Sequence, residues 1–129
     1  MIRQETIKVT TTGADAAATG ATNSNSAIAG KILAIWIDYH ASCPATADVT
    51  ITEYVGSVSR QTIHTETDSA TDVMRYPRRA VEDNAEATVE YSNNYSIYEP
   101  YVVQGQIRVA VAGANALTDC VVVDVIYEA

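Results

Sequence analysis

The stretch from Ala29 to His40, AGKILAIWIDYH, constrains the fold more than any other part of the chain. Apolar or aromatic side chains stand at the odd positions from Leu33 to Tyr39 and also at the even positions from Ile32 to Trp36. Because successive side chains of a β-strand point to opposite faces, a strand with this pattern is expected to be covered on both faces. The sequence therefore predicts a central strand here.

Short segments that alternate apolar and polar residues, separated by turn residues, recur along the rest of the chain. They are Ile2 to Thr11, Asp48 to Val55, Val58 to Thr67, Ala85 to Tyr91, Tyr95 to Tyr101, Val102 to Ala112 and Cys120 to Tyr127. A helix is the alternative for Ala85 to Tyr91, but no segment has the period of a convincing amphipathic helix. This pattern predicts an all-β, single-domain β-sandwich, jelly-roll-like, with about eight strands.

Residues 1–26 are expected to differ from the rest of the domain. Ile2 to Thr11 is predicted to be an edge strand with one solvent-exposed face, which also suits a docking arm. Thr12 to Ser26 consists mainly of Gly, Ala, Thr, Ser and Asn, without a bulky apolar residue, and is predicted to be a long flexible loop that buries no core face. The sequence thus predicts an N-terminal arm and flexible loop in residues 1–26 and a β-sandwich body in residues 27–129.

The charge of the chain limits its partners. The formal net charge is -8, whereas proteins that bind DNA or RNA depend on clustered Lys and Arg to contact phosphates. No apolar run approaches the ~18 residues of a membrane span, and the N-terminus lacks the apolar segment of a secretory signal. We therefore expect no nucleic-acid partner, no membrane partner, and synthesis in the cytoplasm.

The chain has two cysteines, Cys43 and Cys120. Two thiols cannot form a structural zinc site unaided, because such a site takes four ligands. In a reducing compartment both are expected to be free, and a disulfide is the alternative if the mature protein resides outside cells.

No set of residues forms a recognisable active site. Asp38 with His40, and His64 with Glu66, are pairs spaced by two, so each pair lies on one face of its strand. The four would form a metal site only if the two strands were adjacent, in register and facing the same side, and separate surface positions are the simpler interpretation. The chain also lacks a G-x-S-x-G motif. We therefore predict no enzymatic activity, no catalytic residue, no bound metal and no cofactor.

A basic cluster stands out in this acidic chain. It comprises Arg75, Tyr76, Arg78 and Arg79. Because Arg forms forked hydrogen bonds to carboxylates, the cluster is a candidate for contact with a neighbouring subunit, such as another copy of the chain. The alternative is pairing within the chain to the nearby Asp68 or Asp72.

Tyrosine is abundant, with eight residues and no Phe, and four of the eight fall in one segment. These four are Tyr91, Tyr95, Tyr98 and Tyr101. Tyr is enriched at protein interfaces, so we expect core and subunit contacts, with stacking on a carbohydrate as the alternative. The predicted partner-binding residues are thus Tyr95, Tyr98 and Tyr101, the basic cluster, and Ile2, Ile7 and Val9 of the N-terminal strand.

The segments GKILAIWIDYHASCPATADVTIT, DVMRYPR and YEPYVVQGQIRVAVAGA resemble the small β-rich virion proteins of tailed bacteriophages, particularly the capsid decoration or cement proteins. The resemblance covers most of the chain after Ala27. It implies a non-enzymatic protein on the capsid surface of the virion, which binds the outer face of the assembled capsid and clamps adjacent major capsid subunits.

Such proteins often act as trimers or dimers at local symmetry axes, so the resemblance implies a homo-oligomer, with a homotrimer favoured over a homodimer. The N-terminal strand and loop are then expected to contact the major capsid protein, and the arginine and tyrosine segments to contact sister subunits. Other phage parts have a similar composition. A carbohydrate- or surface-binding β-sandwich module of a phage tail or fibre is therefore the alternative function.

Overall fold

The computed structural model describes the whole chain, residues 1–129, as twelve strands without a helix. The strands are β1 (Ile2–Val9), β2 (Ala18–Asn23), β3 (Ile28–Tyr39), β4 (Asp48–Val55), β5 (Val58–Glu66), β6 (Val73–Arg75), β7 (Arg78–Ala80), β8 (Glu90–Ser92), β9 (Tyr95–Ser96), β10 (Tyr98–Pro100), β11 (Val102–Ala114) and β12 (Val121–Glu128).

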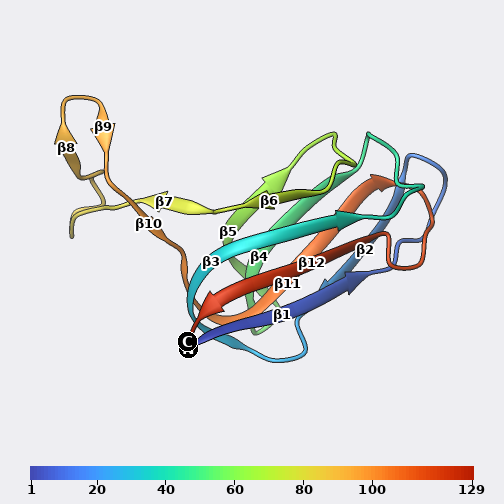
Figure 1. Cartoon of the computed structure of the whole chain (residues 1–129), viewed down its shortest axis with the longest axis horizontal. Helices are drawn as coiled ribbons and strands as arrows, with labels where there is room; N and C mark the ends of the chain where they lie inside the picture. Colours follow the sequence, from blue (N-terminus) through green and yellow to red (C-terminus); the bar gives the residue numbers. More distant parts are fainter.

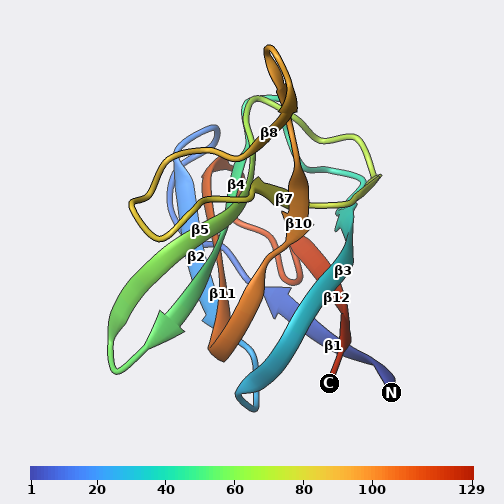
Figure 2. The same cartoon turned by 90° about the vertical axis from the view of Figure 1, so that its left-hand side faces the viewer.

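Eight of these strands form one continuous antiparallel sheet that folds over into two layers (Figure 1 and Figure 2). The front layer has the order β1-β12-β3-β6, and the back layer has the order β2-β11-β4-β5. The start of β11 pairs with β3, and this pairing joins the two layers. The predicted all-β, single-domain sandwich with about eight strands is confirmed.

The core lies between the two layers and is made of alternate residues of each strand. Ile35 and Ile37 of β3, Ile51 of β4, Val109 of β11 and Val123 of β12 each have 0% of their surface exposed. Because the period of a strand is two, this alternation turns the remaining residues toward solvent.

β3 is a central strand, as predicted, since it pairs with β12 along one edge and with β6 and β11 along the other. Two different features of the structure account for the apolar residues on both faces of β3. A register shift opposite Ile126 and Tyr127 changes the alternation, so that Ile32 and Ile35 are both fully buried. Beyond the shift, Trp36 lies on the outer face of the front layer and is only half-buried. The predicted cover on both faces is therefore only partial.

The N-terminal residues belong to the sandwich. β1 is an edge strand, as predicted, and pairs along its whole length with β12. The prediction of a flexible loop after it is wrong, because residues 18–23 form β2, in which Ala18 is fully buried. A Cβ atom on Gly20 would lie 2.3 Å from the carbonyl oxygen of Thr10. The small residues of this segment thus allow a close approach between strands, and residues 1–26 contribute to both layers.

The chain passes from the back layer to the front layer between β2 and β3. Both strands pair with β11, with Asn23 opposite Arg108 and Ile28 opposite Gly105. At this corner Ser24 is buried, its backbone N–H donates to the carbonyl of Ile107 at 2.8 Å, and its hydroxyl accepts from the Ile107 N–H at 3.0 Å. Both polar groups of the corner are therefore satisfied without water.

β11 changes layers at the same corner, where the carboxylate of Glu53 holds it. Glu53 is 1% exposed and accepts two hydrogen bonds of 2.9 Å from Arg60, one of 3.1 Å from Gln61 and one of 2.5 Å from the backbone N–H of Gln104. Burial acts to raise the pKa of Glu53, but these hydrogen bonds outweigh burial, and the pKa is lowered. Glu53 is therefore ionised and fixes β11 just before residue 106, where its pairing with β4 begins.

We expect Glu53→Gln to lower the free energy of unfolding by about 2 kcal/mol at pH 7, because it removes the charge that Arg60 and the Gln104 N–H contact. A carboxylate with a lowered pKa stabilises the fold above its ordinary value of 4.5, and this stabilisation is lost as the pH falls through the folded-state pKa. Urea titrations of both proteins should therefore converge as the pH falls below 4.5. Glu90→Gln, at an exposed acid, serves as the control and should change neither the free energy of unfolding at pH 7 nor its dependence on pH. A constant difference at all pH values would contradict this role.

Candidate functional site

Residues 76–101 leave the sandwich after β6, return at β11 and project from the body (Figure 1). We call these residues the arm. Next to the body the arm is a ribbon of β7 paired with β10, and its far end carries the small hairpin of β8 and β9. Both strands of the ribbon have one unpaired edge, which leaves backbone N–H and C=O groups available to another strand.

The base of the arm is anchored to the front layer. Pro77 is buried, and Tyr101 packs against the core while its carbonyl accepts a hydrogen bond of 2.9 Å from the N–H of Ile32. Arg78 donates to the carbonyl of Leu33 at 3.2 Å. The hydrogen bonds of Tyr101 and Arg78 are both made to β3, so the central strand of the body fixes the direction of the arm.

Beyond the ribbon, backbone hydrogen bonds give the arm its shape in place of a core. Val81 donates to Ile97 at 2.8 Å, Val89 donates to Val81 at 2.8 Å, and Ile97 donates to Val89 at 3.2 Å. The carboxylate of Asp83 accepts from the N–H groups of the two alanines that follow it in the next turn. The outer arm is therefore a defined structure that adds no residue to the main hydrophobic core.

The arm exposes an unusual amount of aromatic surface. Exposed fractions are 65% for Tyr76, 70% for Tyr91, 60% for Tyr95 and 64% for Tyr98. The rings of Tyr91 and Tyr95 lie together at the far end, with centroids 5.9 Å apart. Of the predicted partner-binding tyrosines, Tyr95 and Tyr98 are thus accessible, together with Tyr76 of the basic cluster, whereas Tyr101 is partly buried at the base.

The arginines of the basic cluster have different partners. Arg75 of β6 donates to Glu66, and Arg79 lies 3.4 Å from Glu82 and 3.8 Å from Glu99. Pairing within the chain therefore occurs for these two, although not with the predicted Asp68 or Asp72. Arg78 contacts only backbone carbonyls and no carboxylate.

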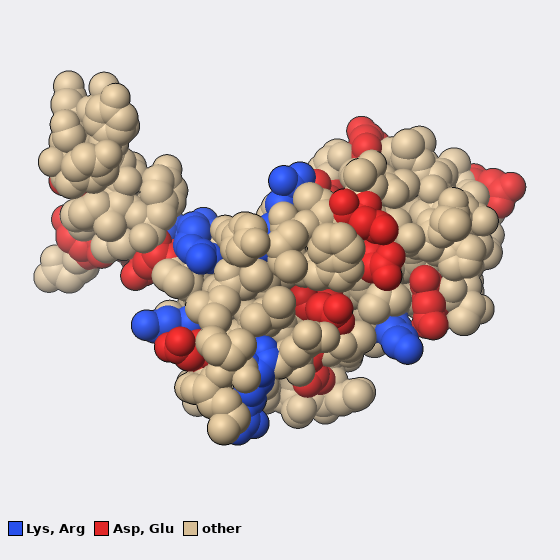
Figure 3. Space-filling view, in the orientation of Figure 1, with Lys and Arg blue, Asp and Glu red and all other residues tan.

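Charge is distributed unevenly over the arm (Figure 3). Basic residues lie near the base of the arm, acidic residues lie further out along it, and most of the hairpin at its far end is uncharged on this face. The turn at the tip is Ser92, Asn93 and Asn94, so the tip presents the aromatic pair of Tyr91 and Tyr95 beside uncharged polar side chains. Aromatic residues flanked by polar ones are common in protein interfaces.

The N-terminal candidates are not all accessible. Ile2 is 58% exposed, but Ile7 is 2% exposed and Val9 is 0% exposed. Both buried side chains point between the layers, because the alternation of β1 turns them toward the core. The prediction that Ile7 and Val9 contact a partner is therefore wrong for the folded chain.

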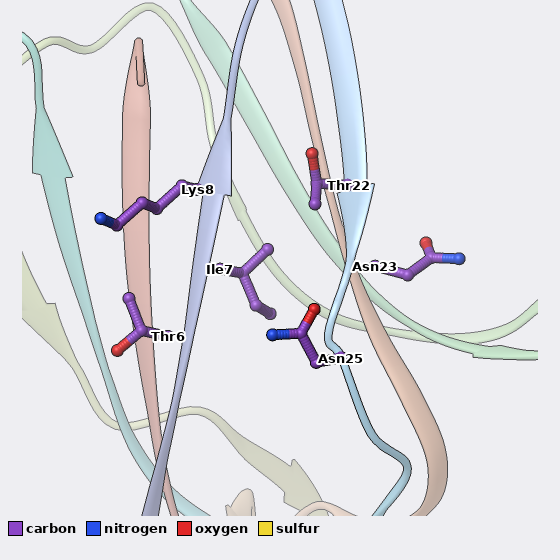
Figure 4. Close-up of a pocket in the computed structure, with 6 residues that line it drawn as sticks. All are labelled: Thr6, Ile7, Lys8, Thr22, Asn23 and Asn25. Atoms are coloured by element: carbon purple, nitrogen blue, oxygen red, sulfur yellow. The ribbon is translucent and has the colours of Figure 1, made fainter. Parts of the chain in front are cut away.

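A groove of about 300 Å³ lies between the edges of β1 and β2 (Figure 4). Its lining residues are Thr6, Ile7, Lys8, Thr22, Asn23 and Asn25. Ile7 and Asn25 point toward each other across the groove, whereas Thr6 and Lys8 point away from it on the far side of β1. The polar groups do not converge on one point, so the groove lacks the arrangement that orients a small ligand.

The two histidine–carboxylate pairs do not meet in one site. Asp38 and His40 lie at the end of β3 in the front layer, while His64 and Glu66 lie on β5 in the back layer. His64 is 3.0 Å from Glu66, and the hydrogen bond from Arg75 is the main cause that lowers the pKa of Glu66. No group of three or more His, Cys, Asp and Glu residues is placed to hold a metal ion.

Sequence reasoning identified the tyrosines but missed the arm that carries them. The available signal is the run EDNAEAT in residues 82–88, which has no large apolar side chain, next to single valines at positions 81 and 89. A segment of this composition cannot bury a face against a core. The alternation from Ala85 to Tyr91 instead predicts a strand of the sandwich, and that prediction is wrong.

Comparison with protein-family models, with curated proteins and with solved structures finds no match. The structure also contains no helix with the length and apolar character needed to cross a membrane.

We expect the sandwich to fold without the outer arm. Replacing residues 81–97 with Asn-Gly joins Ala80 to Tyr98, which are opposite each other in the ribbon, through a tight hairpin turn. The free energy of unfolding, measured in urea, should change by less than about 1 kcal/mol, because no core residue is lost. Deletion of residues 18–23, which removes β2, is the control and should prevent folding. A truncated arm that also prevents folding would contradict the separation of arm and core.

Proposed function

We propose that this protein is a non-enzymatic structural protein of a virion, a capsid decoration or cement protein. In this role it binds the outer surface of the capsid and clamps neighbouring major capsid subunits. The resemblance of the sequence to the decoration proteins of tailed bacteriophages suggests this role, and the projecting arm is the observation that carries it.

The arm supports the proposal because it extends the reach of a stiff body. A buried Tyr side chain contributes 150–250 Å² of contact area at small entropic cost, so a few tyrosines can dominate the affinity of an interface. Here Tyr91, Tyr95 and Tyr98 are presented away from the sandwich, where they add nothing to the core. A body on one capsid subunit with an arm on the next is the geometry of a clamp.

Self-association is the second part of the proposal. We assign the contact between sister subunits to the base of the arm, where Arg78 has no carboxylate partner within the chain. A homotrimer is favoured over a homodimer, because the decoration proteins that the sequence resembles often act as trimers at local symmetry axes. Several copies acting together would strengthen capsid binding, because linked weak contacts add to the total affinity.

A second candidate function is a carbohydrate- or surface-binding module of a phage tail or fibre. The observation that favours it is the exposed ring pair of Tyr91 and Tyr95 at the tip of the arm. Tyr combines a flat apolar ring with a polar hydroxyl, which suits stacking on the apolar face of a sugar.

Co-sedimentation with empty capsids of the virus that carries this chain tests the main proposal. The full chain should sediment with the capsids at a saturable, symmetric stoichiometry, and the chain with Asn-Gly in place of residues 81–97 should lose at least tenfold in affinity. Val58→Ser, at a 62% exposed apolar residue on the body, is the matched control and should bind as the full chain does.

If the full chain stays in the supernatant, the capsid role is overturned. A change in tyrosine fluorescence on adding oligosaccharides would then favour the second candidate. Equal binding by the truncated and full chains would remove the arm from the capsid contact.

Self-association is tested by light scattering. Arg78→Glu combined with Arg79→Glu should shift the solution mass toward the monomer, because the reversed charges repel a sister subunit's carboxylates. Arg3→Glu, an exposed arginine on β1, makes the same change of charge per residue and should leave the mass unchanged. An unchanged mass in the double variant would place the subunit contact elsewhere.

A further inference from the structure

The two cysteines, 77 positions apart in the sequence, meet at one end of the sandwich. Cys43 lies in the turn that follows β3, and Cys120 directly precedes β12. Their Sγ atoms are 3.7 Å apart. A disulfide requires about 2.05 Å between the sulfur atoms, so the two sulfur atoms, already in van der Waals contact, have to approach by ~1.7 Å to form one.

The backbone already holds the two residues together. The N–H of His40 donates to the carbonyl of Cys120 at 2.8 Å, and the N–H of Cys43 donates to the carbonyl of His40 at 2.9 Å. The side-chain amide of Asn115 also reaches the carbonyl of Ser42 at 3.4 Å. The turn after β3 and the loop before β12 thus form one hydrogen-bonded unit around the two thiols.

The surroundings of the pair favour a bond between the thiols over other cysteine chemistry. Cys120 is fully buried and Cys43 is 9% exposed. No His, Asp or Glu joins them in a metal-binding group. Burial is the main cause that raises the pKa of Cys43 to about 12, with Cys120 adding to it, so its thiol stays protonated and reacts slowly with external reagents at neutral pH.

We infer that Cys43 and Cys120 are a disulfide-forming pair, reduced when the chain folds in a reducing compartment and joined once it meets an oxidant outside the cell. The inference does not depend on the proposed function, because it rests on the geometry of the pair alone. It does supply a covalent lock for a protein that must persist outside cells.

The chemistry needs an external acceptor of two electrons, for which a small-molecule disulfide is sufficient. Cys43, the more accessible thiol, attacks the reagent through the small fraction of it that is thiolate, and its proton passes to the small thiol that is released, which leaves a mixed disulfide. Cys120 then attacks the Cys43 sulfur, releases the second small thiol and completes the internal bond. One reagent disulfide becomes two thiols, and the protein loses two hydrogens.

The bond would close a loop spanning 77 positions, which removes conformational freedom from the unfolded chain. A loop of this size is expected to raise the melting temperature by about 10 °C. The increase should be seen without any change in the fold, since the connected segments are already hydrogen-bonded.

The test is to incubate the full chain with oxidised glutathione and follow its thiols, mass and melting temperature. We expect both thiols to disappear when counted in denaturant, the mass to fall by two hydrogens, and a peptide map to link Cys43 to Cys120. The melting temperature should rise by about 10 °C and return to its first value after reduction. Cys43→Ala, which retains Cys120 alone, is the control and should show no rise.

A stable glutathione adduct, a disulfide between two chains, or a linked protein that melts at or below the reduced one would overturn the inference. Slow entry of the reagent is a separate matter, because both thiols are shielded. If glutathione leaves the thiols unreacted, oxidation during refolding from urea should give the same linked, more stable protein. Failure to form the bond by that route would also overturn the inference.

Discussion

The fold depends on how one sheet turns over on itself at a corner, and a buried carboxylate holds that corner. Glu53 lies between the two layers and accepts hydrogen bonds from Arg60, Gln61 and the backbone of Gln104. On the other side of β11, Ser24 forms hydrogen bonds with the backbone of Ile107 at the point where the chain passes from β2 to β3. A buried charge costs several kcal/mol unless it is paired, and its complete set of donors makes this position specific for one arrangement of strands.

The body and the arm are stabilised by different interactions. In the body, alternate residues of long strands fill a core of Ile and Val, and polar groups inside it have hydrogen-bond partners with few exceptions. In the outer arm, short backbone ladders and an aspartate-capped turn hold the chain without a core. Aromatic side chains that would be buried in the body are exposed in the arm. This difference is expected where one part of a molecule provides stability and another part provides contact with a partner.

The alternation of apolar and polar residues was sufficient to predict the sandwich, the edge position of β1 and the central position of β3. The same alternation gave wrong predictions where residues distant in the sequence determine which side chains are buried. The small residues around Gly20 were predicted to form a loop, because their role is to let strands approach closely, which only the tertiary structure reveals. The alternation around Val89 predicts a strand of the body, although the backbone of Val89 pairs with Val81 and Ile97 within the arm and not with the main sheet. The proximity of Cys43 and Cys120 likewise depends on the strand order, which the sequence does not specify.

The attachment of the arm has a mechanical consequence. Its two stems continue directly into β6 and β11, and both of these strands pair with β3 in the middle of the molecule (Figure 1). A pull on the tip therefore acts nearly along these strands and loads several backbone hydrogen bonds at the same time, in shear. The alternative, in which a force peels an edge strand away, breaks such bonds one after another. Because both stems join strands that pair with β3, tension on the arm is borne first by the pairings of β6 and β11 with the central strand.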